Sequence, residues 1–106
     1  MVERYYNEKN EMGILISSGF GAGWGTWYEK QEIAYDKRIV EKWINEKPSG
    51  EEMKVFLESL GYKDVYMGGY DSLVLWFVPK GTTFCIQEYD GAEGVFTYED
   101  LQLITA

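Results

Sequence analysis

A glycine- and tryptophan-rich segment at residues 19–27 has the composition best suited to binding a ligand. Glycine occupies positions 19, 21, 23 and 25, and four alternating glycines would weaken an ordinary strand. Glycine permits positive φ angles and close approach of the backbone, so the N–H groups here could line a nest for an anion. The rings of Phe20, Trp24 and Trp27 could stack on a flat base. The alternative is that the tryptophans fill the core and the glycines make room for them.

This segment does not match the two common phosphate-binding loops. A Walker loop requires a lysine after its last glycine, but Thr26 follows Gly25 here. A dinucleotide-binding loop requires glycine at positions i, i+2 and i+5. Counting from Gly19 or Gly21 puts Trp24 or Thr26 at the third position. What remains is a long glycine-rich loop with large aromatic residues, a type of loop that often carries function.

Arginine is scarce, because Arg4 and Arg38 are the only two in the chain. Arg38 is therefore the best single candidate for a contact with a phosphate group. A purely structural interpretation also accounts for this region. Asp36 would cap a helix that begins at residue 37, and Arg38 would form an ion pair with Glu41 one turn later.

Three carboxylates, Glu88, Asp90 and Glu93, lie close together in the sequence. Such a group could hold Mg²⁺ or act as an acid–base pair. However, Asp90-Gly91 is a typical turn sequence, and a turn needs no carboxylate chemistry. We therefore predict a hairpin turn here, with no metal, no cofactor and no catalytic residue.

The composition excludes several classes of function. The chain has no histidine, so a Ser-His-Asp or Cys-His device cannot be built. The single cysteine, Cys85, cannot form an internal disulfide and fits a reducing cytoplasm. A net charge of −8 disfavours a nucleic-acid polymer as partner. No apolar run is long enough to span a membrane, and the N-terminus is too polar for a signal peptide.

The aromatic content of 17% exceeds what a core of this size can bury. Some rings are therefore expected on a binding face or in a contact between copies.

Local patterns predict one compact α+β domain with a mixed or antiparallel sheet of about five strands and two helices. Helices are expected at 37–46 and 50–60, and the spacing of Thr26 and Glu29 would also allow a helix to start after Gly25. Residues 1–12 either form a loose arm or are held to the body by Tyr5 and Tyr6. Strands are expected at 13–17, 64–67, 73–78, 83–89 and 93–98, with 101–105 as a further edge strand.

Residues 13–27, with the sequence GILISSGFGAGWGTW, resemble a family of small tailed-phage proteins. The hallmark of that family is Gly-Tyr/Phe-Gly-Ala-Gly-Trp-Ser-Thr-Trp after a first strand, and Gly25 stands here in place of the serine. The similarity extends to residues 36–41, 68–69, 78–82 and 88–91. It implies a phage-encoded accessory protein in the cytoplasm of an infected bacterium. The glycine, aromatic and arginine residues of this chain look like those of "sponges" that sequester the nucleotide signals of Thoeris and CBASS defence. That likeness implies a homo-oligomer with ligands held near subunit contacts.

Three hypotheses follow. The first is a non-enzymatic binder of a small nucleotide, such as an ADP-ribose-derived or cyclic nucleotide signal. The second is a protein-interaction module that inhibits a host protein. The third is a metal-dependent hydrolase that uses Asp90, Glu88 or Asp36. The ligand-binding residues expected under the first are Phe20, Gly21, Ala22, Gly23, Trp24, Thr26, Trp27 and Arg38.

Overall fold

A computed structural model describes residues 1–97 of the 106-residue chain. This part contains four strands, two α-helices and three short 3-10 turns, so the predicted α+β class is confirmed. In chain order these elements are β1 (Glu11–Ser17), η1 (Gly25–Trp27), η2 (Gln31–Ala34), α1 (Lys37–Glu46), α2 (Gly50–Ser59), η3 (Met67–Ser72), β2 (Leu73–Pro79), β3 (Phe84–Tyr89) and β4 (Ala92–Thr97).

The prediction of about five strands in one sheet is wrong. Among the strands of the described residues, β1 pairs with β2 and β3 with β4, both antiparallel, and no strand joins the two pairs. Residues 64–67 do not form a strand, because Asp64 has a positive φ of 58° and the η3 turn begins at Met67. The end of β1 meets β4 through a side chain, since the Ser17 N–H donates to the Glu93 carboxylate at 2.7 Å. The strand predicted at 101–105 lies outside the described residues.

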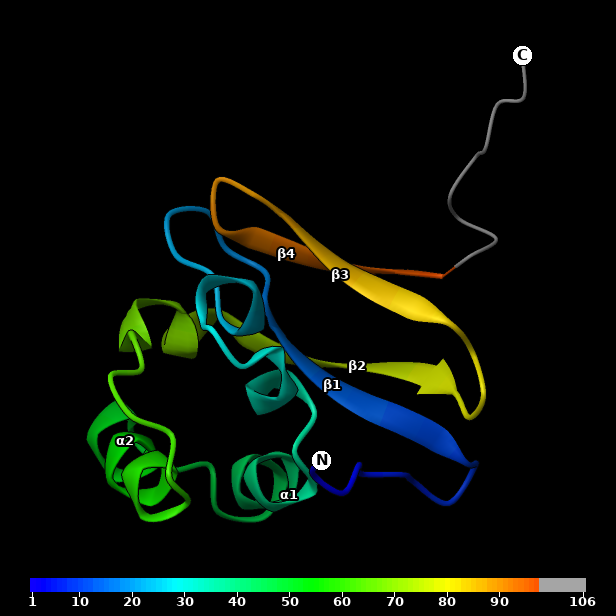
Figure 1. Cartoon of the computed structure of the whole chain (residues 1–106), viewed down its shortest axis with the longest axis horizontal. Helices are drawn as coiled ribbons and strands as arrows, with labels where there is room; N and C mark the ends of the chain where they lie inside the picture. The colour runs from blue at the N-terminus through cyan, green and yellow to red at the C-terminus, as the bar shows by residue number, and fades with distance from the viewer. Residues whose placement is uncertain (98–106) are drawn as a thin grey trace.

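Strand β1 forms the centre of the core, because every residue after Glu11 in it is buried. Helices α1 and α2 lie on one side of the β1–β2 pair, and the β3–β4 hairpin lies on the other (Figure 1). A Cβ atom built on Gly13 would be 3.5 Å from a methyl group of Val40 in α1. On the hairpin side, Ile86 of β3 belongs to the same buried cluster. The molecule thus has three layers.

Both predicted α-helices form, and each begins at the expected cap. The Asp36 carboxylate accepts the Arg38 N–H at the start of α1, while Ser49 and Glu52 form a capping box at the start of α2. The helix that Thr26 suggested is limited to the single turn η1, where no side-chain cap forms and the Thr26 hydroxyl donates to Glu93. Within residues 1–97, no helix is long and apolar enough to cross a membrane.

The N-terminal residues run beside β1. The Gly13 N–H donates to the Tyr5 carbonyl at 3.0 Å, and the Lys37 N–H donates to the Glu3 carbonyl at 2.8 Å. The Tyr5 ring packs half-buried against the core. Of the two arrangements considered for residues 1–12, the one in which Tyr5 joins this segment to the body describes the structure.

Candidate binding site at the glycine-rich loop

The backbone of the glycine-rich loop is bound by a carboxylate of the protein itself. Glu93 in β4 is only 7% exposed, and its two oxygens accept four hydrogen bonds. One oxygen accepts the Ser17 N–H at 2.7 Å. The other accepts the Trp24 N–H at 2.9 Å, the Thr26 N–H at 2.9 Å and the Thr26 hydroxyl at 2.6 Å. The N–H nest predicted for a phosphate therefore exists as an anion-binding arrangement, and Glu93 fills it.

Further contacts fix the loop to the turn between β3 and β4. The Gly21 N–H donates to the Asp90 carbonyl at 2.6 Å, and the Ser17 hydroxyl donates to the Ala22 carbonyl at 2.8 Å. Gly91 has a φ of +88°, and a Cβ atom there would overlap the Ala22 backbone. A Cβ atom on Gly69 would lie 2.6 Å from the Gly23 carbonyl oxygen. These glycines allow backbone-to-backbone packing that any side chain would prevent, so the loop is closely packed.

The two tryptophans of the loop have different surroundings. Trp24 is 2% exposed and packs against Tyr70, with ring centroids 6.1 Å apart. Its indole N–H is buried and has no hydrogen-bond partner within the described residues. Trp27 is 44% exposed and stacks on Tyr66 at 6.1 Å with an interplanar angle of 22°. The core interpretation therefore describes Trp24, whereas Trp27 has a ring available to a partner.

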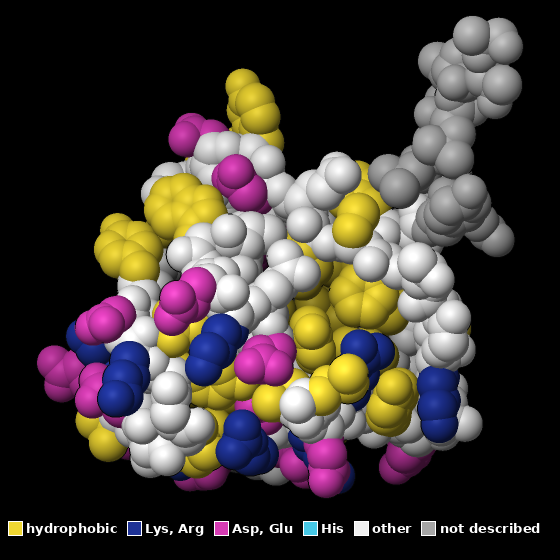
Figure 2. All heavy atoms as spheres, viewed as in Figure 1, with side chains coloured by type: hydrophobic (Ala, Val, Ile, Leu, Met, Phe, Trp, Pro, Cys, Tyr) yellow, Lys and Arg dark blue, Asp and Glu magenta, His cyan; other side chains and the backbone are white. Residues whose placement is uncertain are grey.

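Four aromatic side chains at this end of the molecule are exposed, and we call them the aromatic tip: Phe20 (74%), Trp27 (44%), Tyr66 (60%) and Tyr89 (79%). Contacts between their segments hold them near one another. Phe20 and Tyr89 flank the Gly21–Asp90 hydrogen bond, and the Trp27 indole lies 3.4 Å from the Glu88 carboxylate. Figure 2 shows hydrophobic rings projecting at this end with acidic side chains among them.

The tip has acidic surroundings. Glu88 and Asp90 are both exposed beside Tyr89. Glu88 accepts the Gly91 N–H at 2.8 Å. Asp90 and Gly91 both have positive φ, which is the two-residue hairpin turn that the sequence predicted. No group of three or more Asp, Glu, Cys or His residues suited to a metal occurs within residues 1–97. Exposed carboxylates at the tip repel phosphate and attract cations.

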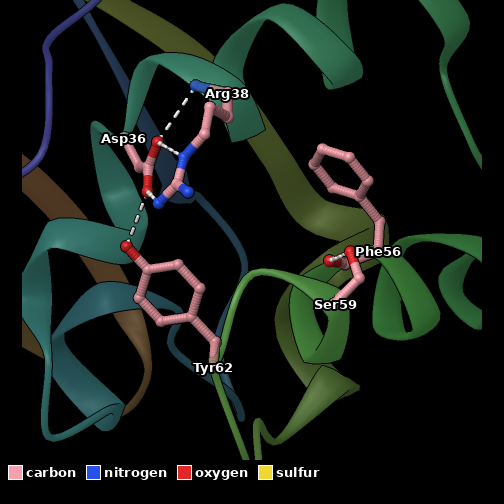
Figure 3. A network of polar contacts seen from close by, with 5 residues as sticks. All are labelled: Asp36, Arg38, Phe56, Ser59 and Tyr62. Atoms are coloured by element: carbon pink, nitrogen blue, oxygen red, sulfur yellow. Dashed lines mark hydrogen bonds and ion pairs between the residues drawn. The ribbon is translucent and has the colours of Figure 1, made fainter.

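Arg38 lies in a different part of the molecule from the loop. Its guanidinium donates to both carboxylate oxygens of Asp36, from Nε at 3.1 Å and from Nη2 at 2.7 Å. The predicted cap at Asp36 is confirmed, but Arg38 pairs with Asp36 and not with Glu41 as expected. The Tyr62 hydroxyl completes this network by donating to Asp36 at 2.7 Å (Figure 3).

Electrostatics hold the Asp36 network in one protonation state. Asp36 is 1% exposed, and burial would raise the pKa of its carboxyl. The hydrogen bonds from Arg38 and Tyr62 outweigh burial, so this pKa lies below its ordinary value. Burial and the neighbouring carboxylate raise the pKa of Tyr62, which therefore remains a donor. Arg38 is thus oriented by a buried anion while half of its side chain stays exposed.

No protein-family model, curated protein or solved structure matches this chain at a significant level.

Arg38 borders a surface pocket of about 510 Å³, which Met1, Glu3, Lys37 and Glu41 also line. None of the predicted loop residues lines that pocket. The structure therefore brings Phe20 to Trp27 together at one end and places Arg38 elsewhere. Sequence reasoning missed Tyr66 and Tyr89 as tip residues and the role of Glu93 as the loop's anchor. The sequence does show Glu93 in the strand after the hairpin turn. No local pattern, however, connects Glu93 to Trp24, which is 69 residues away.

Proposed function

We propose that this protein is a non-enzymatic interaction module that binds a partner protein through its aromatic tip. The observation that carries this proposal is the combination of four exposed rings with a loop whose Gly21, Trp24 and Thr26 N–H groups are bonded to Glu93 and the β3–β4 turn. Rigid aromatic side chains give large contact area with little loss of conformational entropy, and they dominate protein interfaces. We therefore rank the interaction module above the nucleotide binder, since these three N–H groups already have acceptors within the protein and the tip carboxylates repel phosphate.

The acidic side chains of the tip define the chemistry of the partner. Glu88 and Asp90 stand beside exposed rings, and the whole chain carries a net charge of −8. A surface with apolar pockets and a basic rim complements this arrangement. By the resemblance to phage accessory proteins, that partner would be a protein of the infected bacterium.

Variants at the tip test this proposal. We expect the double variant Trp27→Ala/Tyr89→Ala to bind a purified partner at least about 100-fold more weakly, because two central aromatic contacts each contribute about 1.4 kcal/mol or more. The partner would be captured from bacterial lysate, identified by mass spectrometry, purified and titrated by calorimetry. Raising the salt concentration should weaken binding further, since the contact is charge-complementary.

The matched control is Val55→Ala, because Val55 is 69% exposed on α2 and is not one of the four tip residues. It should bind like the wild type. Equal affinity of the tip variant and the control, or failure of the wild type to retain any stoichiometric partner, would overturn the proposal.

Nucleotide sequestration is the second candidate, and one observation favours it. The Arg38 guanidinium is half exposed at a pocket of about 510 Å³ and is oriented by the buried Asp36. An oriented arginine of this kind suits a phosphate group. Among residues 1–97, none of those that line this pocket is aromatic, so the described lining offers a phosphate contact but no ring for a stacked base.

Thermal unfolding with cyclic ADP-ribose isomers and cyclic dinucleotides tests the nucleotide candidate. At a hundredfold excess over Kd, a bound ligand stabilises the fold by about 2.7 kcal/mol. We expect this shift with wild type and with Lys54→Gln, a change of an exposed α2 lysine, but not with Arg38→Gln. Ligand released intact after heating would identify a binder and exclude a hydrolase. No shift with any of these nucleotides would eliminate this candidate.

A further inference from the structure

Strand β2 presents an open edge that is unusually apolar. It pairs with β1 along one side, and no strand pairs with its other side in the part of the chain that the structure describes. Residues 73–79 include no charged side chain, although exposed edge strands are normally protected by charges. Val74 (38%), Trp76 (50%) and Phe77 (38%) are exposed on it.

The hydrogen bonds at the two ends of this strand pair fix which backbone groups face outward. The Ser18 N–H donates to the Ser72 carbonyl at 3.0 Å, and the Lys80 N–H donates to the Asn10 carbonyl at 2.9 Å. Hydrogen-bonded residues alternate in an antiparallel pair, so the even-numbered residues of β2 face β1. The N–H groups of Leu75 and Phe77 therefore point to the open edge, whereas the Leu73 N–H donates to the Tyr70 carbonyl within the chain. Pro79, at the next outward position, has no N–H to donate.

We propose that a second copy of this chain occupies this edge, with the two β2 strands antiparallel about a two-fold axis at Leu75. Leu75 would then form a hydrogen-bonded pair with Leu75 of the second copy, and the Phe77 N–H would donate to the Leu73 carbonyl of the second copy. Val74 of each copy would lie opposite Trp76 of the other copy, so this pair occurs twice. Both pairs are at non-hydrogen-bonded positions, where opposed side chains are closer together. A β-branched residue beside an aromatic ring is a favourable cross-strand pair.

Charge favours a second copy in this orientation. Two molecules of charge −8 repel one another overall. However, a contact through β2 places no carboxylate between the two strands, because residues 73–79 are uncharged. The strand is flanked by Asp71 at one end and Lys80 at the other, both exposed. An antiparallel contact brings the acidic end of each strand to the basic end of the other. The result is a four-stranded sheet in the order β1–β2–β2–β1, and this dimer does not depend on the identity of the tip's partner.

Sedimentation equilibrium of the wild type and two valine variants tests the dimer. We expect wild-type protein to show twice the 12.3 kDa chain mass at about 100 µM. A concentration this high is needed because a contact made by one strand from each copy is small and lies at the weak end of specific interfaces. Val74→Glu should be monomeric, because it places a carboxylate against Trp76 of the second copy. Val55→Glu on α2 should remain a dimer. A monomeric wild type, or a dimeric Val74→Glu, would overturn the proposal.

Cysteine pairs test the register and keep the proposal testable if Val74→Glu does not fold. In a Cys85→Ser background, Val74→Cys and Trp76→Cys proteins would be mixed and oxidised. Opposed non-hydrogen-bonded positions have Cα atoms about 4.5 Å apart, within the range of a disulfide. We expect a disulfide-linked dimer in the mixture and little in either variant alone. Equal cross-linking in all three samples, or none in the mixture, would contradict this register.

Discussion

Replacing Glu93 with alanine is expected to lower the free energy of unfolding by about 4 kcal/mol, because each buried N–H left without an acceptor costs about 1–3 kcal/mol. The change leaves the N–H groups of Ser17, Trp24 and Thr26 without an acceptor. Two of these groups lie in buried residues, where water cannot easily replace the carboxylate. Urea unfolding followed by far-UV circular dichroism measures the difference.

Two further variants make the Glu93 result specific. Glu93→Gln should cost about 2 kcal/mol, because its oxygen can still accept from the loop while its NH₂ group meets the Ser17 N–H. Glu58→Ala changes an exposed α2 glutamate and should stay within about 0.5 kcal/mol of wild type. A Glu93→Ala protein as stable as Glu58→Ala would show that the loop does not depend on this anchor.

Replacing Asp36 with alanine is expected to lower the free energy of unfolding by about 3 kcal/mol. The loss removes the cap of α1, the Tyr62 hydrogen bond and the partner of Arg38. This value is near the lower end of the range for breaking a buried ion pair, because the half-exposed Arg38 guanidinium can be hydrated again. Asp36→Asn keeps the shape and the cap, so it should lose less.

The Asp36 contribution should also depend on pH. Its pKa in the folded state lies below the ordinary value of 3.8, so the carboxylate stabilises the fold above that value. This stabilisation should disappear as the pH falls from 3.8 through the lower folded-state pKa. The measurement is the difference in unfolding free energy between wild type and Asp36→Asn across the acid range. A difference that stays constant on acidification would contradict the assigned ion pair.

Sequence alone determined the elements whose signals are local. Helix α1 begins at the Asp36 cap and α2 at the Ser49–Glu52 box, because a cap joins residues only two or three positions apart. The hairpin turn at Asp90-Gly91 followed from glycine's tolerance of positive φ. The buried strand at residues 13–17 followed from its unbroken apolar run. Each of these predictions needed only neighbours in the chain.

Tertiary structure decided what the glycine-rich loop became. The sequence showed that the loop could form an anion nest, but the anion is Glu93, which is 69 residues from Trp24. The sequence did not distinguish Trp24 from Trp27. In the structure Trp24 is buried against Tyr70, whereas Trp27 stacks on Tyr66 and stays exposed. The sequence suggested Arg38 as a companion of the loop, whereas the fold directs it to Asp36. Local patterns show which groups can make a contact. Which partner each group meets depends on how distant parts of the chain pack together in the dense interior of the fold.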